Sequence, residues 1–495
     1  MSEVPTQAAV RQRWRTLGLV VGLVLFLIGA VLVLPITYPD GDTRFAIAWG
    51  GELLRGSTPS FEGIVPIKHP LTLVGGAVVS VLPPQTAINA TAIGALVTFV
   101  VLGFGVFRLG RLLAGTAAGA LAVVVVLSRP EIIFGALAAR KDLLFAALVI
   151  AAAALVATAP RKNWAWALGL LGAAGLIRPE AWMLAAGYGA WLIWGVQVDL
   201  RTRRLVIGLV LSAPVIWALI DLTLTGSPFH TIGSGSDRAS IEAAGFIEPG
   251  ADGLQVSGLR RFRGFVEIGI PGIIGWPATV AAILVGAQAL ISWRQGERST
   301  SYAALIAIVA IVVAMLGVAV VLNVFSLPLQ DRFLIVAAVA VGILAASALA
   351  GARSSPLLGG ALAILVIGVL VGHPGDFDDT RADAQRNEKN RNDASALASL
   401  VAQPAVSQAV AECSALEVAS KVRTSAQFGR ATLGVELEVP VDDIEPVREP
   451  RLTRGGSVFG FKLKQLRRKA VQNNRRAPKP ETVAGVEPWG FVSAC

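Results

Sequence analysis

Two carboxylates, Asp40 and Asp42, stand just after the first apolar run of the chain. Phe45, Trp49 and Leu53 follow them at near-helical spacing, and Asp42 occupies the position where the N-cap of that helix would lie. A plain capping role is one interpretation of Asp42, but a cap needs only one acid. The second carboxylate is therefore available for chemistry such as proton transfer. The pattern predicts an amphipathic helix that lies on the membrane, with two carboxylates at its start.

Most other charged residues lie in loops, and the centres of the apolar runs are nearly free of charge; even Asp221 lies close to the end of its run. A secondary transporter usually buries ionisable residues at mid-membrane. Charges at the ends of the runs instead favour a reaction at one membrane surface, with substrates held partly in lipid. Several of these cations have an acid nearby in the sequence: Arg44 near Asp42, Lys141 beside Asp142, Arg178 near Glu180, and Arg332 beside Asp331.

The elements that must position these residues are membrane helices. Of 495 residues, 54% are hydrophobic and 15% charged, whereas a soluble domain has about 25% charged residues. The first apolar run lacks a small-residue cleavage site, which indicates a retained helix rather than a signal peptide. We predict an all-α polytopic membrane protein with about eleven transmembrane helices. They are expected at 16–36, 86–107, 113–128, 142–159, 164–177, 181–197, 204–222, 271–292, 301–323, 333–352 and 356–372, with a re-entrant or surface helix at 70–81.

Three arginines precede the first span, which places the N-terminal tail, residues 1–15, in the cytoplasm. The membrane domain then covers residues 16–372, and its large first loop, residues 37–85, faces outward from the cell (inner) membrane. An odd number of spans places residues 373–495 outside as well, as a small extracytoplasmic domain.

The net charge of +10 indicates contact with membrane lipids rather than nucleic acid, because the basic residues are scattered among short loops and the tail. The sequence has no P-loop, dinucleotide fingerprint or zinc-like spacing. Asn89-Ala-Thr91 matches a glycosylation sequon by pattern only.

The tail carries the two cysteines of the chain, Cys413 and Cys495. On an oxidising side of the membrane they predict one disulfide, which would close a domain with little core of its own. Two free thiols are the alternative. Within the tail, the stretch from Ala394 to Val418 is expected to be helical.

From residue 16 to about 372 the chain resembles the GT-C superfamily of membrane glycosyltransferases, which includes protein mannosyltransferases and aminoarabinose transferases. The resemblance consists of several weak motifs in the expected order. Two positions depart from the usual pattern: Phe45 stands where tyrosine is common, and His69-Pro70 stands where paired prolines are common. The motifs are Asp42-Thr-Arg-Phe45, Gly50 to Pro59, Lys68-His69-Pro70-Leu71, Ser128 to Asp142, Leu176-Ile-Arg178-Pro-Glu180, Thr225-Gly-Ser-Pro228 and Arg332-Phe333.

The resemblance implies transfer of a hexose or pentose from a polyprenyl-phosphate donor to a hydroxyl of a glycan, lipid or protein, with inversion. Such a displacement needs a carboxylate that takes the acceptor's proton and cations that neutralise the leaving phosphate. Asp42 is the expected base, with Asp40 as its orienting partner or substitute.

The expected substrate-binding residues lie at outer ends of spans, where arginine suits phosphate because its planar fork binds two oxygens. For each cation the alternative is a contact with lipid headgroups. No cofactor is certain; acids of the site could orient these cations or hold a divalent metal, Mg²⁺ or Mn²⁺. The alternative functions are a flippase or exporter of lipid-linked glycans without chemistry, and a polymerase or ligase of such glycans. The binding candidates are Lys68, His69, Arg140, Lys141, Asp142, Arg178, Glu180 and Arg332.

Overall fold

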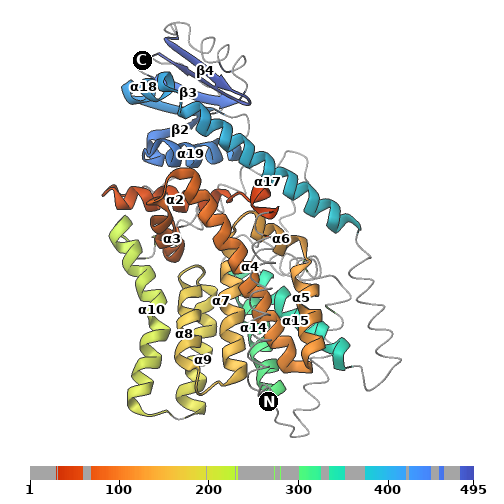
Figure 1. The fold of residues 1–495 in the computed structure, drawn as a ribbon. Helices are drawn as coiled ribbons and strands as arrows, with labels where there is room; N and C mark the ends of the chain where they lie inside the picture. Colours follow the sequence, from red (N-terminus) through yellow and green to blue (C-terminus); the bar gives the residue numbers. More distant parts are fainter. Residues whose placement is uncertain are drawn as a thin grey trace, which may run out of the picture.

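A bundle of helices and a smaller mixed domain make up the computed structural model of the chain (Figure 1). The structure describes residues 32–59, 68–196, 198–228, 230–231, 300–324, 334–351, 374–419, 423–447, 456–461 and 480–494, with a few isolated positions between them. The expected spans at 271–292 and 356–372, and most of the span at 16–36, lie outside these residues.

Apart from α6, which falls in a segment expected to be a loop, the helices of the bundle coincide with the other expected spans. Three described helices are long and apolar enough to cross a membrane, or up to five if each of two bent helix pairs counts as one span. The protein is thus a multi-pass membrane protein, and the number eleven stays a prediction. The bundle consists of α4 (Pro84–Ala114), α5 (Thr116–Leu127), α6 (Pro130–Leu137), α7 (Lys141–Thr158), α8 (Trp164–Gly175), α9 (Glu180–Ala190) with η2 (Trp191–Gly195), α10 (Leu200–Thr225), α14 (Thr300–Val324) and α15 (Ile335–Gly351).

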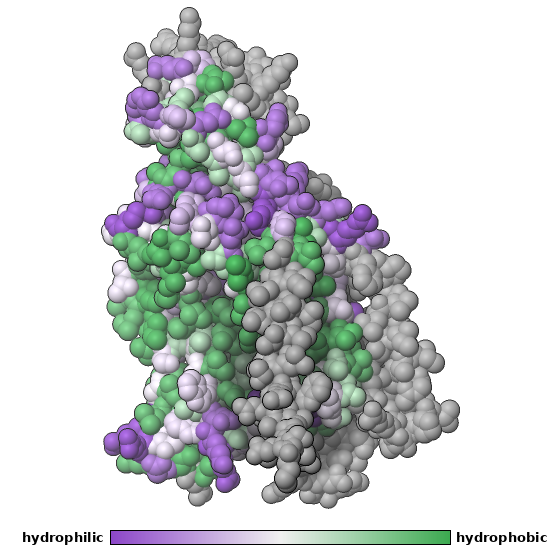
Figure 2. Space-filling view, viewed as in Figure 1, coloured by the Kyte–Doolittle hydropathy of each residue, from purple (hydrophilic) through white to green (hydrophobic). Residues whose placement is uncertain are grey.

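Small residues let these helices approach closely, as is usual where lipid provides no hydrophobic driving force between helices. A side chain at Gly105 of α4 would meet Ile150 of α7, and one at Gly110 would meet Gly119 of α5. Large apolar side chains such as Phe104 face outward instead. Figure 2 shows the result as a hydrophobic middle with hydrophilic residues at both ends of the bundle.

One end of the bundle is basic. Arg108 of α4 donates to Thr158 at the end of α7, and Tyr188 of α9 donates to the carbonyl of Pro160. These bonds place the ends of α4, α7 and α9 on the same side, opposite the mixed domain (Figure 1). The basic residues near this end are Arg108, Arg111, Arg161, Lys162, Arg201, Arg203 and Arg204.

The expected helix after the first span is α2 (Gly41–Leu54), and its start differs from the prediction. Asp40, not Asp42, is the N-cap, because its side chain accepts from the backbone N–H of Thr43 at 2.9 Å. Asp42 lies in the first turn instead. The cap therefore leaves the Asp42 carboxylate for other partners.

The apolar face of α2 is covered by protein rather than by the membrane surface, which corrects the second part of that prediction. Phe45 and Trp49 are each 2% exposed and pack with Leu73 of α3 (Pro70–Ser80), the expected short helix. Ala431 and Val441 of the mixed domain complete this cluster. The helical pattern of α2 thus serves packing between domains.

Two glycines allow α2 and α3 to touch along their backbones. A Cβ at Gly50 would overlap the backbone of Ala77, and a Cβ at Gly76 would overlap the carbonyl of Ala46. Gly75, one position earlier in α3, faces open space. The close approach fixes α3 against the helix that carries Asp42.

The tail contains a five-stranded sheet, so the chain is not all-α. The strands are ordered β2-β1-β3-β5-β4, with β1 parallel to β2 and β3 and the other pairs antiparallel. Phe459 and Phe491 pack in its core with their rings tilted at 51°, and Trp489 donates to the carbonyl of Asp393. Its elements are α17 (Pro374–Val401), α18 (Pro404–Glu412), β1 (Ala415–Ala419), α19 (Arg423–Leu437), η5 (Val441–Asp443), β2 (Ile444–Val447), β3 (Gly456–Phe461), β4 (Thr482–Val486) and β5 (Trp489–Ser493).

The expected helix from Ala394 to Val418 is wrong at both ends. Helix α17 begins at Pro374, and Pro404 starts the separate helix α18 because proline cannot continue the α17 hydrogen-bond pattern. The chain then enters β1. Cys413, between α18 and β1, is disulfide-bonded; Cys495 lies outside the described residues, so its pairing with Cys413 stays a proposal.

The contact between α2 and α3 predicts a sharp difference between neighbouring glycines. Gly76→Ala should destabilise the protein by about 1–3 kcal/mol or more, because its methyl group has no space against Ala46. Gly75→Ala should be tolerated. Thermal unfolding of both variants in detergent checks this, and equal unfolding temperatures would contradict the described contact.

Burial raises the pKa of Glu436, in α19, to about 7. Because this folded-state pKa lies above the unfolded value near 4.5, ionisation costs stability as the pH rises from about 4.5 to about 7. Glu436→Gln should therefore stabilise the protein by about 1–3 kcal/mol at pH 8 and hardly at all near pH 4.5. The same change at exposed Glu388 is the control; a pH-independent effect of Glu436→Gln would contradict the burial of its carboxyl.

Candidate functional site

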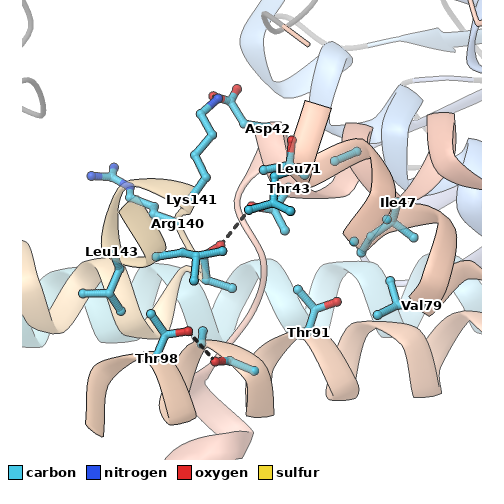
Figure 3. A pocket seen from close by; sticks show the side chains of 18 of the residues that line it. Asp42, Thr43, Ile47, Leu71, Val79, Thr91, Thr98, Arg140, Lys141 and Leu143 are labelled. Atoms are coloured by element: carbon cyan, nitrogen blue, oxygen red, sulfur yellow. Dashed lines mark hydrogen bonds and ion pairs between the residues drawn. The ribbon is translucent and has the colours of Figure 1, made fainter. Parts of the chain in front are cut away.

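A pocket of about 290 Å³ opens where α2, α3 and α4 meet the turn between α6 and α7 (Figure 3). Its polar end is formed by Asp42, Arg140 and Lys141. Apolar or small residues form most of the remaining wall, so the pocket suits a molecule with a charged head and an apolar body. These are mainly Ala46, Ile47, Leu71, Gly75, Gly76, Val79, Ala90, Gly94, Ala95, Leu143 and Leu144, with Thr43, Thr72, Thr91, Thr98 and Ala139.

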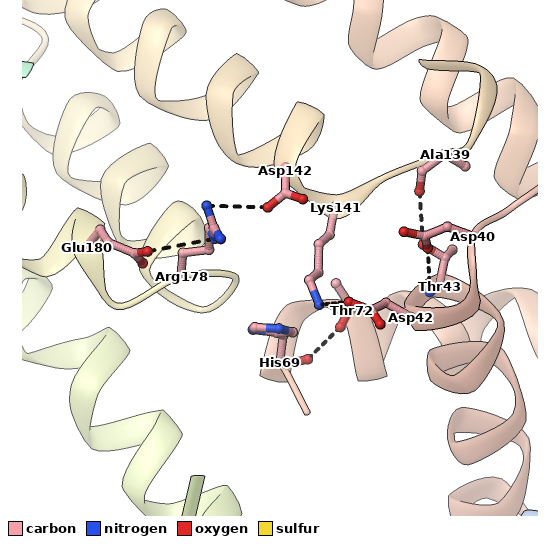
Figure 4. Close-up of polar contacts among 10 residues, drawn as sticks. All are labelled: Asp40, Asp42, Thr43, His69, Thr72, Ala139, Lys141, Asp142, Arg178 and Glu180. Carbon is pink, nitrogen blue, oxygen red and sulfur yellow. Dashed lines mark hydrogen bonds and ion pairs between the residues drawn. The ribbon is translucent and has the colours of Figure 1, made fainter. Parts of the chain in front are cut away.

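Asp42 and Lys141 form an ion pair across the polar end. The Lys141 Nζ lies 2.7 Å from the Asp42 Oδ2, and the side chains are 8% and 22% exposed. The sequence places Lys141 beside Asp142, but successive residues at the start of α7 point in different directions (Figure 4). Lys141 therefore faces α2, and the pair joins two segments that are far apart in the chain.

Asp40 lies beside this pair but is not part of the pocket wall. Burial, and then the neighbouring charge of Asp42, raise the pKa of the Asp40 carboxyl above its usual value. Its bond to the Thr43 N–H opposes that rise and ties the carboxyl to the cap of α2. The structure thus gives the two acids different surroundings: Asp40 holds the helix, and Asp42 faces the pocket.

Arg140 adds a second cation at the same end. It is the N-cap residue of α7, and its guanidinium lies 4.3 Å from the centre of the Phe134 ring. The positive end of the α7 dipole points toward the same place. Two cations and a helix N-terminus favour an anionic ligand here.

Arg178 forms a separate cluster, away from the pocket wall (Figure 4). Its guanidinium lies 3.4 Å from Asp142 and 3.8 Å from Glu180, and all three residues are nearly buried. The cluster ties the turn before α9 to the start of α7. These three predicted binding residues therefore pair with one another and do not line the described pocket.

Lys68 and His69 also lie outside the pocket wall. The Lys68 Nζ is 3.3 Å from Asp221 at the end of α10, and burial lowers the pKa of the Lys68 amine although Asp221 opposes the shift. His69 packs edge-on against Trp217. Asp221 also accepts from the backbone N–H and hydroxyl of Thr231.

Sequence reasoning missed Asp221 as a site-supporting residue, although an acid at the end of an apolar helix requires a partner. It also missed Thr43, whose hydroxyl donates to the carbonyl of Ala139 in the turn before Arg140. Arg332 lies outside the described residues.

Among the described residues, no group of three or more His, Cys, Asp or Glu side chains could hold a metal ion. The Asp42 carboxylate is paired with Lys141, and the neighbouring Asp40 carboxylate caps α2, so the two acids are not arranged to hold a divalent metal. The described residues of the pocket therefore do not fit Mg²⁺ or Mn²⁺.

Comparison with known proteins gives a likeness in structure alone. No protein-family model matches the chain, and no curated protein matches its sequence. The crystal structure of ArnT from Cupriavidus metallidurans bound to undecaprenyl phosphate matches with a TM-score of 0.56 and 13% identity, over 96% of this chain and 98% of ArnT.

A looser match is the archaeal oligosaccharyltransferase AglB from Archaeoglobus fulgidus in complex with an inhibitory peptide and a dolichol-phosphate. It has a TM-score of 0.47 and 12% identity, over 89% of this chain and 69% of that protein. The match to ArnT extends over nearly the whole length of both chains. This chain therefore shares the fold of ArnT, which agrees with the resemblance that the ordered motifs predict.

Proposed function

We propose that the protein is a glycosyltransferase that moves a sugar from a polyprenyl-phosphate donor to a hydroxyl acceptor at the outer membrane face. One observation carries the proposal: the Asp42 carboxylate and two cations lie at the polar end of an otherwise largely apolar pocket. The likeness to ArnT, whose crystal structure contains undecaprenyl phosphate, agrees with a lipid-linked donor.

The pocket offers a place for each part of such a donor. Its phosphate would lie at the start of α7, near Arg140 and Lys141, where the charges complement it. Its apolar chain would follow the small residues between α3 and α4, since Gly75 and Gly94 leave open space there. The sugar would then lie beside Asp42.

The reaction follows from these positions. An acceptor oxygen attacks the anomeric carbon, the bond from that carbon to the phosphate oxygen breaks, and polyprenyl phosphate leaves. Asp42 takes the acceptor's proton, while Arg140 and Lys141 stabilise the charge on the leaving phosphate. A phosphate that engages Lys141 would also loosen its pairing with Asp42. A single displacement of this kind inverts the anomeric centre.

The basic end of the bundle supports the proposed orientation. Arginines and lysines concentrate on cytoplasmic sides. The end opposite the pocket carries seven of them close together, whereas the pocket-end cations Lys68, Lys141 and Arg178 are paired with acids. The pocket and the C-terminal domain would then face outward. Labelling single engineered cysteines at positions 162 and 388 in intact cells with an impermeant maleimide tests this: only position 388 should react, and the reverse pattern would contradict it.

The activity itself is tested by incubating the purified protein with radiolabelled polyprenyl-phosphate sugars. Transfer of sugar to an acceptor, or its slow hydrolysis from the lipid, identifies an enzyme. Binding without consumption across all donors would instead identify a flippase or exporter. Formation of long products from a single lipid-linked glycan would indicate a polymerase.

The different surroundings of the two acids predict different losses. Asp42→Asn should lower turnover by roughly 10²–10⁴-fold without loss of folded protein, because it removes the base. Asp40→Asn should cost far less, since asparagine caps a helix as well as aspartate. Single-turnover assays compare the two; turnover above about 1% in Asp42→Asn, or a larger loss in Asp40→Asn, would contradict the assignment.

If Lys141 binds the donor phosphate, its removal should weaken the use of the donor. Lys141→Gln should lower kcat/KM for the donor by about 10–100-fold, because a charged hydrogen bond to phosphate contributes about 1.5–3 kcal/mol. Lys162→Gln, at the basic end, is the matched control and should be silent. Steady-state kinetics with varied donor check this, and an unchanged kcat/KM would place the phosphate elsewhere.

A further inference from the structure

The distance between Asp42 and Lys141 depends on how two loop segments lie together. Residues 36–40 lead into α2, and residues 137–140 form the turn from α6 into α7. The N–H of Tyr38 donates to the Leu137 carbonyl at 2.9 Å, and the N–H of Asp40 donates to the Ala138 carbonyl at 2.7 Å. These bonds set the register between the segment of Asp42 and the segment of Lys141.

The turn between α6 and α7 is held by bonds within it and by bonds from outside. Within it, the Arg140 N–H donates to the Gly135 carbonyl at 2.9 Å, as at many helix ends with a left-handed residue. Ala139 has a φ of 47°, in the left-handed region, which costs an ordinary residue about 1–2 kcal/mol. Residues in such conformations persist where surrounding contacts over-determine them. The Thr43 hydroxyl, bonded to the Ala139 carbonyl at 2.9 Å, is one of these contacts.

Helix α17 supplies another, from the C-terminal domain. The Nδ2 of Asn387 donates to the Ile36 carbonyl at 3.0 Å and to the Leu137 carbonyl at 2.6 Å. One amide nitrogen therefore bridges both segments with its two hydrogens. Asn387 is only 4% exposed, although the residues on either side of it in α17 face solvent.

Arg391, one helical turn later, secures the same segment. Its guanidinium donates to the carbonyls of Leu34 at 2.6 Å and Thr37 at 3.0 Å, and to the side chain of Asn89 in α4 at 3.0 Å. The Asn89 side chain, part of the sequon, is thus engaged within the protein. Two residues of α17 together fix the approach to α2.

We propose that Asn387 is a positioning residue of the site, which holds the segment of Asp42 in register with the turn that presents Lys141. The C-terminal domain then completes the site through α17, without contributing a group to the pocket. The proposed effect on turnover rests on the proposed function, whereas the effect on the two segments does not.

Asn387→Asp tests this with an isosteric change that replaces the bridging donor by an acceptor. Asn390→Asp, the same change at an exposed position of α17, is the matched control. Hydrogen–deuterium exchange is measured on peptides covering residues 34–43 and 135–143. In Asn387→Asp, the backbone N–H groups of Tyr38 and Asp40, which join the two segments, should exchange at least about tenfold faster. Their exchange should be unchanged in Asn390→Asp. Unchanged exchange in Asn387→Asp would overturn the proposal.

Kinetics distinguish positioning from a general loss of folded protein. Turnover per folded molecule should fall by roughly 10²-fold in kcat, as expected for a misplaced reacting group, with little change in KM for the donor. Faster exchange with unchanged kcat would overturn the positioning role. If wild-type protein consumes no donor, the proposed function fails, and the exchange result decides on Asn387 alone.

If Asn387→Asp does not fold, Asn387→Ser replaces it. Its hydroxyl has one donor and can satisfy only one of the two carbonyls. It should show intermediate exchange and an intermediate kcat. Wild-type exchange and kcat in the serine variant would overturn the proposal.

Discussion

The ion pair between Asp42 and Lys141 is the contact on which the site depends. It joins α2 to the start of α7 at the polar end of the pocket, and both partners come from segments whose backbones hydrogen-bond to each other. The residue next to Lys141 and the cap residue before Asp42 each form a polar contact of their own. Asp40 caps α2 beneath Asp42, and the Arg178 cluster holds Asp142 next to Lys141.

The C-terminal domain takes part in this arrangement rather than sitting apart from it. Helix α19 covers the apolar face of α2, and Glu52 of α2 accepts from the N–H of Val441 at 2.7 Å. Helix α17 reaches from the sheet to the turn between α6 and α7 (Figure 1). The C-terminal domain therefore contacts both segments that carry the ion pair: α2, which carries Asp42, and the turn before α7, which carries Lys141.

Hydropathy predicted the described helices of the bundle well, because apolar length and charge-free centres leave few alternatives to a membrane helix. The placement of charges at span ends, together with the resemblance to GT-C enzymes, singled out Asp42, Arg140 and Lys141. It did not predict the pairing of Lys141 with Asp42, because Asp142 is the nearer acid in sequence and only the direction of each side chain on α7 decides between them.

The errors have physical reasons of the same kind. Either of two acids spaced by one residue can cap a helix. The choice of Asp40 goes with backbone bonds from Tyr38 and Asp40 to residues 137 and 138, which are distant in sequence. Phe45 and Trp49 show the same pattern whether a membrane or α19 covers them. Asn387 lies among charged residues that indicate an exposed helix, and its burial arises only from packing against residues distant in sequence.

The central claim is that the phosphate of a lipid-linked sugar binds at the start of α7 beside Asp42. The most direct measurement is a cryo-EM structure of the Asp42→Asn variant in lipid nanodiscs with a polyprenyl-phosphate sugar. The phosphate should lie within hydrogen-bonding distance of Arg140 and Lys141, with the apolar chain between α3 and α4. A phosphate bound at the basic end near Arg203, or at Lys68 with the pocket empty, would contradict it.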